Sequence, residues 1–189
     1  PDFFVQLLCM IFRAENDTNN SPPTEDEKAR AHNAYELLGS FTRIPGSRDD
    51  DSVDTDELMA WVRQARELAI ENNRIAICDE RIGEVLAYAP IESVDNARPC
   101  IPVRCALEEL GTEEMLSGFE IGFFNQRGAH WKSLDDGGSQ ERRLSQQFRD
   151  WAQASLVEWP KTAASLRRMA ENYERDAARA DAESQLRLT

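Results

Sequence analysis

The chain has 189 residues, 41% of them hydrophobic and 30% charged, and its formal net charge at pH 7 is −13. This composition is too apolar for a disordered chain and too polar for a membrane protein, and the longest apolar run, Phe3 to Phe12, is far shorter than the roughly 20 residues of a membrane-spanning helix. Such an acidic chain lacks the basic surface that displaces phosphate counterions, so we expect neither a membrane nor a nucleic acid as its partner.

The negative charge is unevenly distributed along the chain. Residues 1–140 hold 13 Lys/Arg against 27 Asp/Glu, a balance of −14, whereas residues 141–189 hold 9 against 8, a balance of +1. The length predicts one α-helical domain over residues 1–189, because a single core commonly serves a chain of this size. An apolar helix directly after Pro1 indicates the C-terminal part of a larger protein.

The first predicted helix covers Phe3 to Phe12. Its apolar residues recur at i, i+3 and i+4: Phe3, Phe4, Leu7, Leu8, Ile11 and Phe12. This spacing predicts a broad apolar face that packs into the core of the domain. The alternative is that the face packs on another part of the protein, or on a second copy, which would make a homodimer through the Phe3–Phe12 helix.

Three further helices are predicted over residues 24–38, 54–72 and 75–89. Thr24 with Glu27 forms a capping-box pattern, Asp54 with Glu57 repeats it, and Pro90 ends the third helix. The segment Arg74 to Cys78 could equally be a strand. The predicted buried stripes are Ala31, Ala34, Tyr35, Leu38, then Leu58, Trp61, Val62, Ala65, Leu68, Ala69, then Ile77, Ile82, Val85, Leu86, Tyr88.

Four more helices are predicted over residues 102–110, 113–126, 139–159 and from 160 onward. Gly118 and Gly122 lie on one face of the second of these, a spacing that lets another helix approach closely. The last helix loses its stripe beyond Ala180, so residues 181–189 are expected to project into solvent or fray. The second of these helices carries a dense apolar cluster, made of Met115, Leu116, Phe119, Ile121, Gly122, Phe123 and Phe124. The third contains Leu144, Phe148, Trp151 and Leu156, and the stripe of the last is Leu166, Met169, Ala170, Tyr173 and Ala177.

Together these elements predict an all-α fold. We expect an irregular array of about eight antiparallel helices, made of helical hairpins and similar to the end of an α-solenoid. The sequence has no repeat of fixed period, which argues against a regular tetratricopeptide or HEAT array.

The metal-ligating residue types are scattered. Cys9, Cys78, Cys100 and Cys105 have no CxxC spacing, and they are interpreted as reduced thiols of a cytoplasmic protein. The acidic run Asp49 to Asp51 lacks the alternating ligands, central Gly and closing Glu of a calcium loop. No metal and no cofactor are therefore expected.

The segment 125–131 is the most unusual stretch, because Arg127, His130 and Trp131 surround a predicted Gly128 turn. Arg and Trp are common at the energetic centres of protein interfaces, so these three residues are the candidate partner contact. The structural alternative is that Trp131 fills the core, His130 caps a helix and Arg127 pairs with a surface carboxylate.

No catalytic motif supports an enzyme. The two histidines, His32 and His130, lie in no nucleophile, metal or phosphate motif, and there is no GxSxG or HExxH. The leading hypothesis is a non-catalytic helical interaction or scaffold domain. The alternative is an enzyme or small-molecule sensor with a pocket between helices.

Three stretches carry a resemblance. Phe3 to Leu8, then Pro23 to Glu25 with Ala34 to Leu38, and later Gly118 and Phe119 with Arg127 to Trp131 resemble the C-terminal region of large uncharacterised bacterial proteins. The resemblance implies a bacterial origin and a piece of a larger protein. The leading hypothesis places the interaction domain at the C-terminus of a multidomain bacterial protein, with stress or phage response as a candidate setting, and with the rest of that parent or another protein as the partner.

Overall fold

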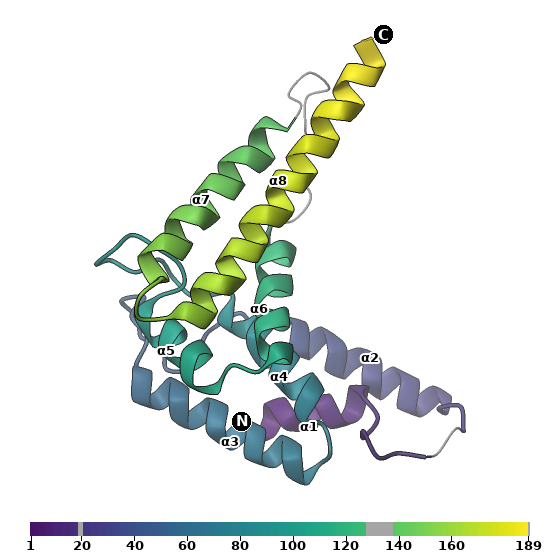
Figure 1. The fold of residues 1–189 in the computed structure, drawn as a ribbon. Helices are drawn as coiled ribbons and strands as arrows, with labels where there is room; N and C mark the ends of the chain where they lie inside the picture. Colours follow the sequence, from purple (N-terminus) through teal and green to yellow (C-terminus); the bar gives the residue numbers. More distant parts are fainter. Residues whose placement is uncertain (19–20, 128–137, 189) are drawn as a thin grey trace.

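The computed structural model describes residues 1–18, 21–127 and 138–188 (Figure 1). Within these ranges the chain forms eight α-helices and no sheet, with one isolated bridge between Ser47 and Val53. The all-α prediction is confirmed. None of the described helices has both the length and the apolar character to cross a membrane. The helices are α1 (Asp2–Ile11), α2 (Glu25–Gly39), α3 (Thr55–Glu71), α4 (Ile75–Leu86), α5 (Ile101–Leu110), α6 (Glu113–Gln126), α7 (Ser139–Ser155) and α8 (Pro160–Leu188).

Local side-chain caps set several helix starts. The Glu27 carboxylate accepts from the Thr24 N–H at 2.7 Å while Thr24 Oγ1 accepts from the Glu27 N–H at 3.3 Å, which is the predicted capping box of α2. Asp54 accepts from the Glu57 N–H at 3.0 Å at the start of α3. The ambiguous segment from Arg74 to Cys78 is helical from Ile75 onward.

Glycines bring α4 and α6 into backbone contact. A Cβ added at Gly118 would lie 1.9 Å from the Glu80 carbonyl oxygen, and one added at Gly83 would lie 2.0 Å from the backbone of α6. Gly122 faces Glu84 one turn later, so both helices advance in the same direction. This pair is parallel, unlike the antiparallel neighbours expected from sequence, because α5 intervenes between them. The predicted close approach at Gly118 and Gly122 is confirmed.

Helix α1 belongs to the core of the body, the name we give to helices α1 to α6. Its inward side chains are almost fully buried: Phe4, Val5, Leu7 and Leu8. The Phe4 ring meets the Trp61 ring of α3 edge-on, with centroids 5.2 Å apart. The buried face of α1 is rotated slightly from the predicted one: Val5 is buried, whereas Phe3 is 55% exposed.

Helices α7 and α8 form an antiparallel hairpin that rises from the body as an arm (Figure 1). Arg142 near the start of α7 binds Asp181 near the end of α8 at 2.6 Å, and the Phe148 and Tyr173 rings stack with centroids 5.5 Å apart. All five predicted stripe residues of α8, from Leu166 to Ala177, are buried. The helix continues to Leu188, beyond the last turn paired with α7.

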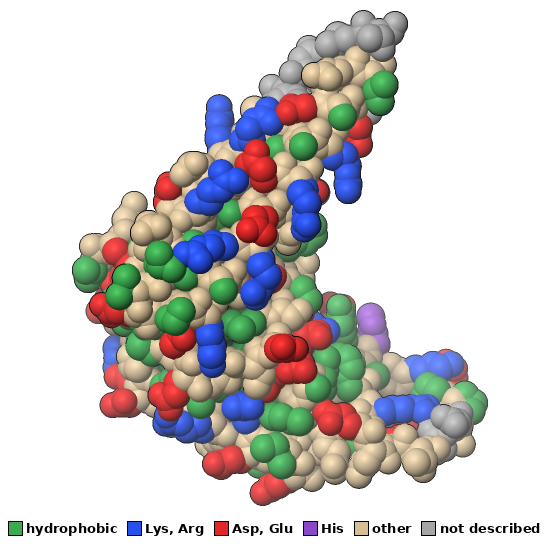
Figure 2. Space-filling view, viewed as in Figure 1, with side chains coloured by type: hydrophobic (Ala, Val, Ile, Leu, Met, Phe, Trp, Pro, Cys, Tyr) green, Lys and Arg blue, Asp and Glu red, His purple; other side chains and the backbone are tan. Residues whose placement is uncertain are grey.

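Three residues on the predicted buried faces are exposed. Phe3, Tyr35 and Tyr88 expose 55%, 53% and 39% of their surface, so their assignment to the core was wrong. Ile121 and Phe124, which belong to the dense apolar cluster of α6, expose 39% and 64%. Helix α6 has apolar residues on more than one face, and its glycine face is the one that packs on α4. Figure 2 shows hydrophobic side chains gathered in the concave corner between the arm and α2.

Two arginines, the buried Arg104 and the half-buried Arg98, hold the connector between α4 and α5, a feature that the sequence did not predict. Arg104 is fully buried and donates to the Pro99 carbonyl oxygen at 2.6 Å and to Asp95 at 3.0 Å. Arg98 donates to Gln126 Oε1 at 3.2 Å, and its guanidinium lies 4.7 Å from the centre of the Phe123 ring. These contacts fasten the connector to the C-terminal end of α6, where the exposed apolar residues begin.

Candidate functional site

Arg127 is the one member of the predicted partner contact that lies within the described residues. It caps the end of α6, and its Nη2 donates to Glu141 Oε1 of α7 at 3.0 Å. Its guanidinium also lies 5.3 Å from the centre of the Tyr173 ring of α8. The carboxylate that it meets is buried rather than on the surface. Arg127 therefore ties α6 to both helices of the arm.

The rest of the predicted contact cannot be placed, because His130 and Trp131 lie outside the described residues. A partner contact shared by the three residues stays a prediction. Since the Arg127 guanidinium already has an ion-pair partner and an aromatic ring, its first role is to join helices.

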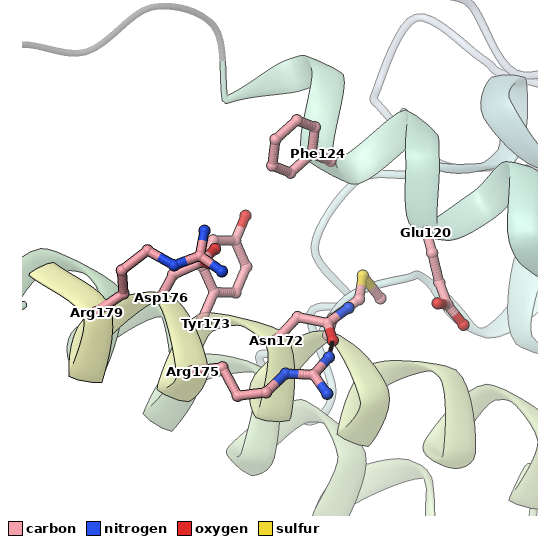
Figure 3. Close-up of a pocket in the computed structure, with 8 residues that line it drawn as sticks. Glu120, Phe124, Asn172, Tyr173, Arg175, Asp176 and Arg179 are labelled. Carbon is pink, nitrogen blue, oxygen red and sulfur yellow. Dashed lines mark hydrogen bonds between the residues drawn. The ribbon is translucent and has the colours of Figure 1, made fainter.

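A surface groove lies beside this junction, between α6 and α8. Its volume is about 470 Å³, and its lining residues are Glu120, Phe124, Met169, Asn172, Tyr173, Arg175, Asp176 and Arg179. Figure 3 shows the Phe124 ring on the α6 side, across from Tyr173 and Arg179 on α8. We name this feature the α6–α8 groove.

The floor of the α6–α8 groove is apolar. Met169 and Tyr173 are 5% and 6% exposed, and both side chains also belong to the hydrophobic core. Burial raises the pKa of the Tyr173 hydroxyl, and the nearby Arg127 cation opposes that rise. Phe124 stands above this floor with most of its ring in solvent. A large apolar side chain held in that position would be stabilised by a partner that covers it.

The charged rim of the α6–α8 groove is partly neutralised within the chain. Arg168 binds Glu120 across the two helices at 2.9 Å through Nε, so that pair closes one end. Arg175 donates to the side-chain amide oxygen of Asn172. Arg179 makes no hydrogen bond or ion pair with any described residue.

A second, smaller depression lies on the other side of α6. It has a volume of about 220 Å³ and is lined by Tyr35, Leu38, Gly39, Arg81, Glu84, Tyr88, Gly122 and Asn125. Phe124 lines the α6–α8 groove, and Ile121 is exposed on the same helix three residues earlier. Tyr35 and Tyr88 line the smaller depression and are also exposed. We name the exposed set Tyr35, Tyr88, Ile121 and Phe124 the apolar strip.

The residue types that could bind a metal ion do not form a site among the described residues. Across the described ranges no three His, Cys, Asp or Glu side chains gather closely enough to bind an ion. In the acidic run, Asp50 accepts from the Ser52 hydroxyl at 2.6 Å and from its N–H at 3.1 Å, and these bonds lower the pKa of the carboxyl group. Asp50 is thus engaged in a local turn.

The thiols are placed as core or near-core groups. Burial raises the pKa of Cys78 to about 12 and also raises the pKa of Cys100. A thiol with a raised pKa carries little thiolate at neutral pH and is a poor nucleophile. Cys78 is one of the residues against which α1 and α3 pack.

Comparisons with family models, curated proteins and solved structures found no match for this chain. The resemblance carried by the three sequence stretches therefore stays a prediction. The features of the molecule that bear on its function are the α6–α8 groove, the apolar strip and the charges around them.

Proposed function

We propose that this chain is a non-catalytic interaction domain that binds a helical segment of another protein on its concave side. The observation that carries the proposal is the exposed Phe124 ring, which stands above the apolar floor of the α6–α8 groove and continues into the apolar strip. Contiguous exposed apolar surface with a polar rim is typical of sites where proteins bind one another. An amphipathic helix fits such a groove by inserting side chains spaced three and four residues apart.

The setting of this interaction is also a proposal. The resemblance of the three sequence stretches supports a bacterial origin and a larger parent protein. A role of that parent in stress or phage response is part of the proposal and goes beyond the resemblance. We propose a cytoplasmic location because the four cysteines are free thiols, two of them buried, and free thiols are typical of a reducing compartment. The acidic composition supports a protein partner over a nucleic acid.

A small-molecule sensor is the second candidate. The groove volume of about 470 Å³ falls within the range of ligand pockets, which is roughly 300–1,000 Å³. Against it, the groove borders the open concave side, and two of its polar groups, Glu120 and Asn172, are already bonded to arginines. A compound that filled it would leave the apolar strip uncovered.

Site-specific crosslinking tests the proposal. A photoreactive amino acid is placed at position 124 of the protein, and the same amino acid is placed at position 157 as the control. Val157 is 89% exposed in the turn between α7 and α8, away from the groove. We expect one protein to crosslink at position 124 and not at position 157.

The crosslinked protein is then purified and its binding measured directly by calorimetry. Phe124→Asp should weaken this binding by at least about 30-fold, the effect of losing an interface residue worth 2 kcal/mol or more, while Val157→Asp should leave it unchanged. Equal binding by both variants would contradict the proposal. Saturable binding of a small molecule at position 124, with no crosslinked protein, would favour the sensor.

A further inference from the structure

We infer that the segment bound by the α6–α8 groove is an acidic amphipathic helix, with a large apolar anchor against Phe124 and carboxylates facing Arg175 and Arg179. This inference rests on the proposed function and adds the chemistry of the partner. It follows from the charges of the rim, the spacing of the two arginines and the size of the groove.

The rim of the groove carries two cations that have no carboxylate partner among the described residues. Arg168 is neutralised by Glu120, but Arg175 binds only the neutral Asn172 amide, and Arg179 forms no ion pair with any described residue. The α8 side of the groove also holds Asp176, so Arg175, Arg179 and Asp176 together carry a charge of +1. That local excess belongs to a chain with a net charge of −13. A partner carboxylate would find its complement here and be repelled by most other parts of the surface.

The spacing of the two arginines suits a helix. Arg175 and Arg179 are four residues apart on α8, so they lie one turn from each other on the same face. Two carboxylates that are three or four residues apart on a partner helix have the same separation. A partner lying along α8 could therefore bind both guanidinium groups from a single face.

The apolar part of the groove determines which partner side chain fits between α6 and α8. The floor formed by Met169 and Tyr173 and the side formed by Phe124 are the apolar members of the lining. A volume of about 470 Å³ accommodates the side chains of one or two helical turns and not a folded domain. A Leu, Met, Phe or Trp at the centre of the partner helix would be covered on both sides.

A displayed peptide library provides the probe. The library encodes helices of about 18 residues with apolar positions drawn from Leu, Met, Phe and Trp, while each flanking position encodes Glu or Lys in equal proportion. It is selected in parallel on the wild-type chain, on Arg175→Glu/Arg179→Glu, on Phe124→Asp and on Val157→Asp. Circular dichroism first checks that each variant keeps its helical content, and Arg175→Gln/Arg179→Gln replaces the charge reversal if that variant unfolds.

The wild-type chain and Val157→Asp should enrich Glu over Lys at the flanking positions by roughly fivefold, the combined effect of two ion pairs of ordinary surface strength. The charge-reversed variant should enrich Lys instead, or show no preference if the Gln variant is used. Phe124→Asp should enrich no peptide. An enriched peptide should also lose affinity for the wild-type chain as salt is raised.

The outcomes separate the inference from the proposed function. If peptides are enriched and lost with Phe124→Asp but show no preference for Glu, the partner chemistry is wrong and the proposed function stands. If peptides bind Phe124→Asp as well as wild type, or if none is enriched, both fail. Peptide-free self-association that is abolished by Phe124→Asp, seen by sedimentation, would identify a second copy as the occupant and overturn the inference. Single-stranded oligonucleotide binding at the same groove would also overturn it.

Discussion

The body and the arm of the molecule are held together in different ways. In the body, α4 and α6 touch through backbone, with glycines at Gly83, Gly118 and Gly122 where no side chain fits. In the arm, α7 and α8 pack through side chains along most of their length, including stacked rings at Phe148 and Tyr173 and an ion pair at Arg142 and Asp181. A glycine brings backbone against backbone only at the start of α7 among the described residues, where Gly138 lies against Ala177 of α8. The close contact fixes one arrangement of two helices, whereas the side-chain layer can be altered one residue at a time. The candidate groove lies at the junction of the two regions.

The largest expected effect comes from charging the buried face of α1 in the body. Leu7→Asp/Leu8→Asp places two carboxylates at positions that are 2% and 0% exposed. Losing the burial of each leucine costs about 1.5–3 kcal/mol, and burying a charge in its place adds to that cost. The total loss of folding free energy reaches the range of typical domain stability, about 5–15 kcal/mol, so we expect the domain to unfold. Far-ultraviolet circular dichroism and solubility measure this.

Met10→Asp is the matched control for α1, because Met10 lies on the same helix and is 54% exposed. It should leave the melting temperature nearly unchanged. If the double variant instead stays soluble with its melting temperature intact and only loses self-association, α1 serves as an interface between copies.

A single methyl group should distinguish the backbone contact in the body from ordinary packing. In Gly118→Ala the new Cβ would lie 1.9 Å from the Glu80 carbonyl oxygen, so the helices must separate. We expect a loss of about 3 kcal/mol, the upper end of the usual cost of overpacking. Gly39→Ala is the control, because nothing lies within 4 Å of its Cβ, and it should be neutral or stabilising by about 0.4–1 kcal/mol. Equal urea midpoints for the two variants would refute the close contact.

The junction between body and arm should depend on the Arg127–Glu141 ion pair. Arg127→Met leaves the buried Glu141 carboxylate without this partner, and a loss of about 3 kcal/mol is expected, at the low end for a broken buried pair because the Arg127 side chain is 17% exposed. Arg127→Met/Glu141→Leu should recover much of that loss, because it removes the buried charge as well. Denaturant unfolding of the two variants measures the difference. A double variant no more stable than the single one would contradict this assignment.

The smallest expected effects are opposite pH dependences in body and arm. Burial raises the pKa of Asp79, against the opposing effect of Arg66, so its folded state holds a proton more tightly than its unfolded state. The stability of wild type relative to Asp79→Asn should therefore fall as pH rises above the ordinary Asp pKa of about 4.

In the arm, Arg142 and the Gly138 N–H lower the pKa of Asp181 to about 2. The stability of wild type relative to Asp181→Asn should be lost as pH falls from about 4 toward 2. Thermal melts between pH 2 and pH 7 test both slopes, and slopes of the same sign would contradict the contrast.

The candidate site shows where the sequence was insufficient. Arg127 was recognised as unusual, yet its partners Glu141 and Tyr173 come from helices that lie 14 and 46 residues further along the chain. Phe124 was grouped with the other apolar residues of its helix, and the sequence did not separate it from those that are buried. Nothing local distinguishes an apolar residue that faces another helix from one that faces an open concave side. One available signal was that α6 has more apolar residues than a single buried face requires.

The sequence by itself determined the helices and many of their ends. Thr24, Asp54 and Thr112 cap helices through bonds to residues three positions away, and such short-range bonds can be read directly from the order of residues. Tertiary structure decided which apolar faces are covered, that α4 and α6 run parallel, and that α6 meets α8 beside an open groove. Those features depend on contacts between residues far apart in the chain, and many pairings of amphipathic helices satisfy the same periodic pattern until close packing selects one.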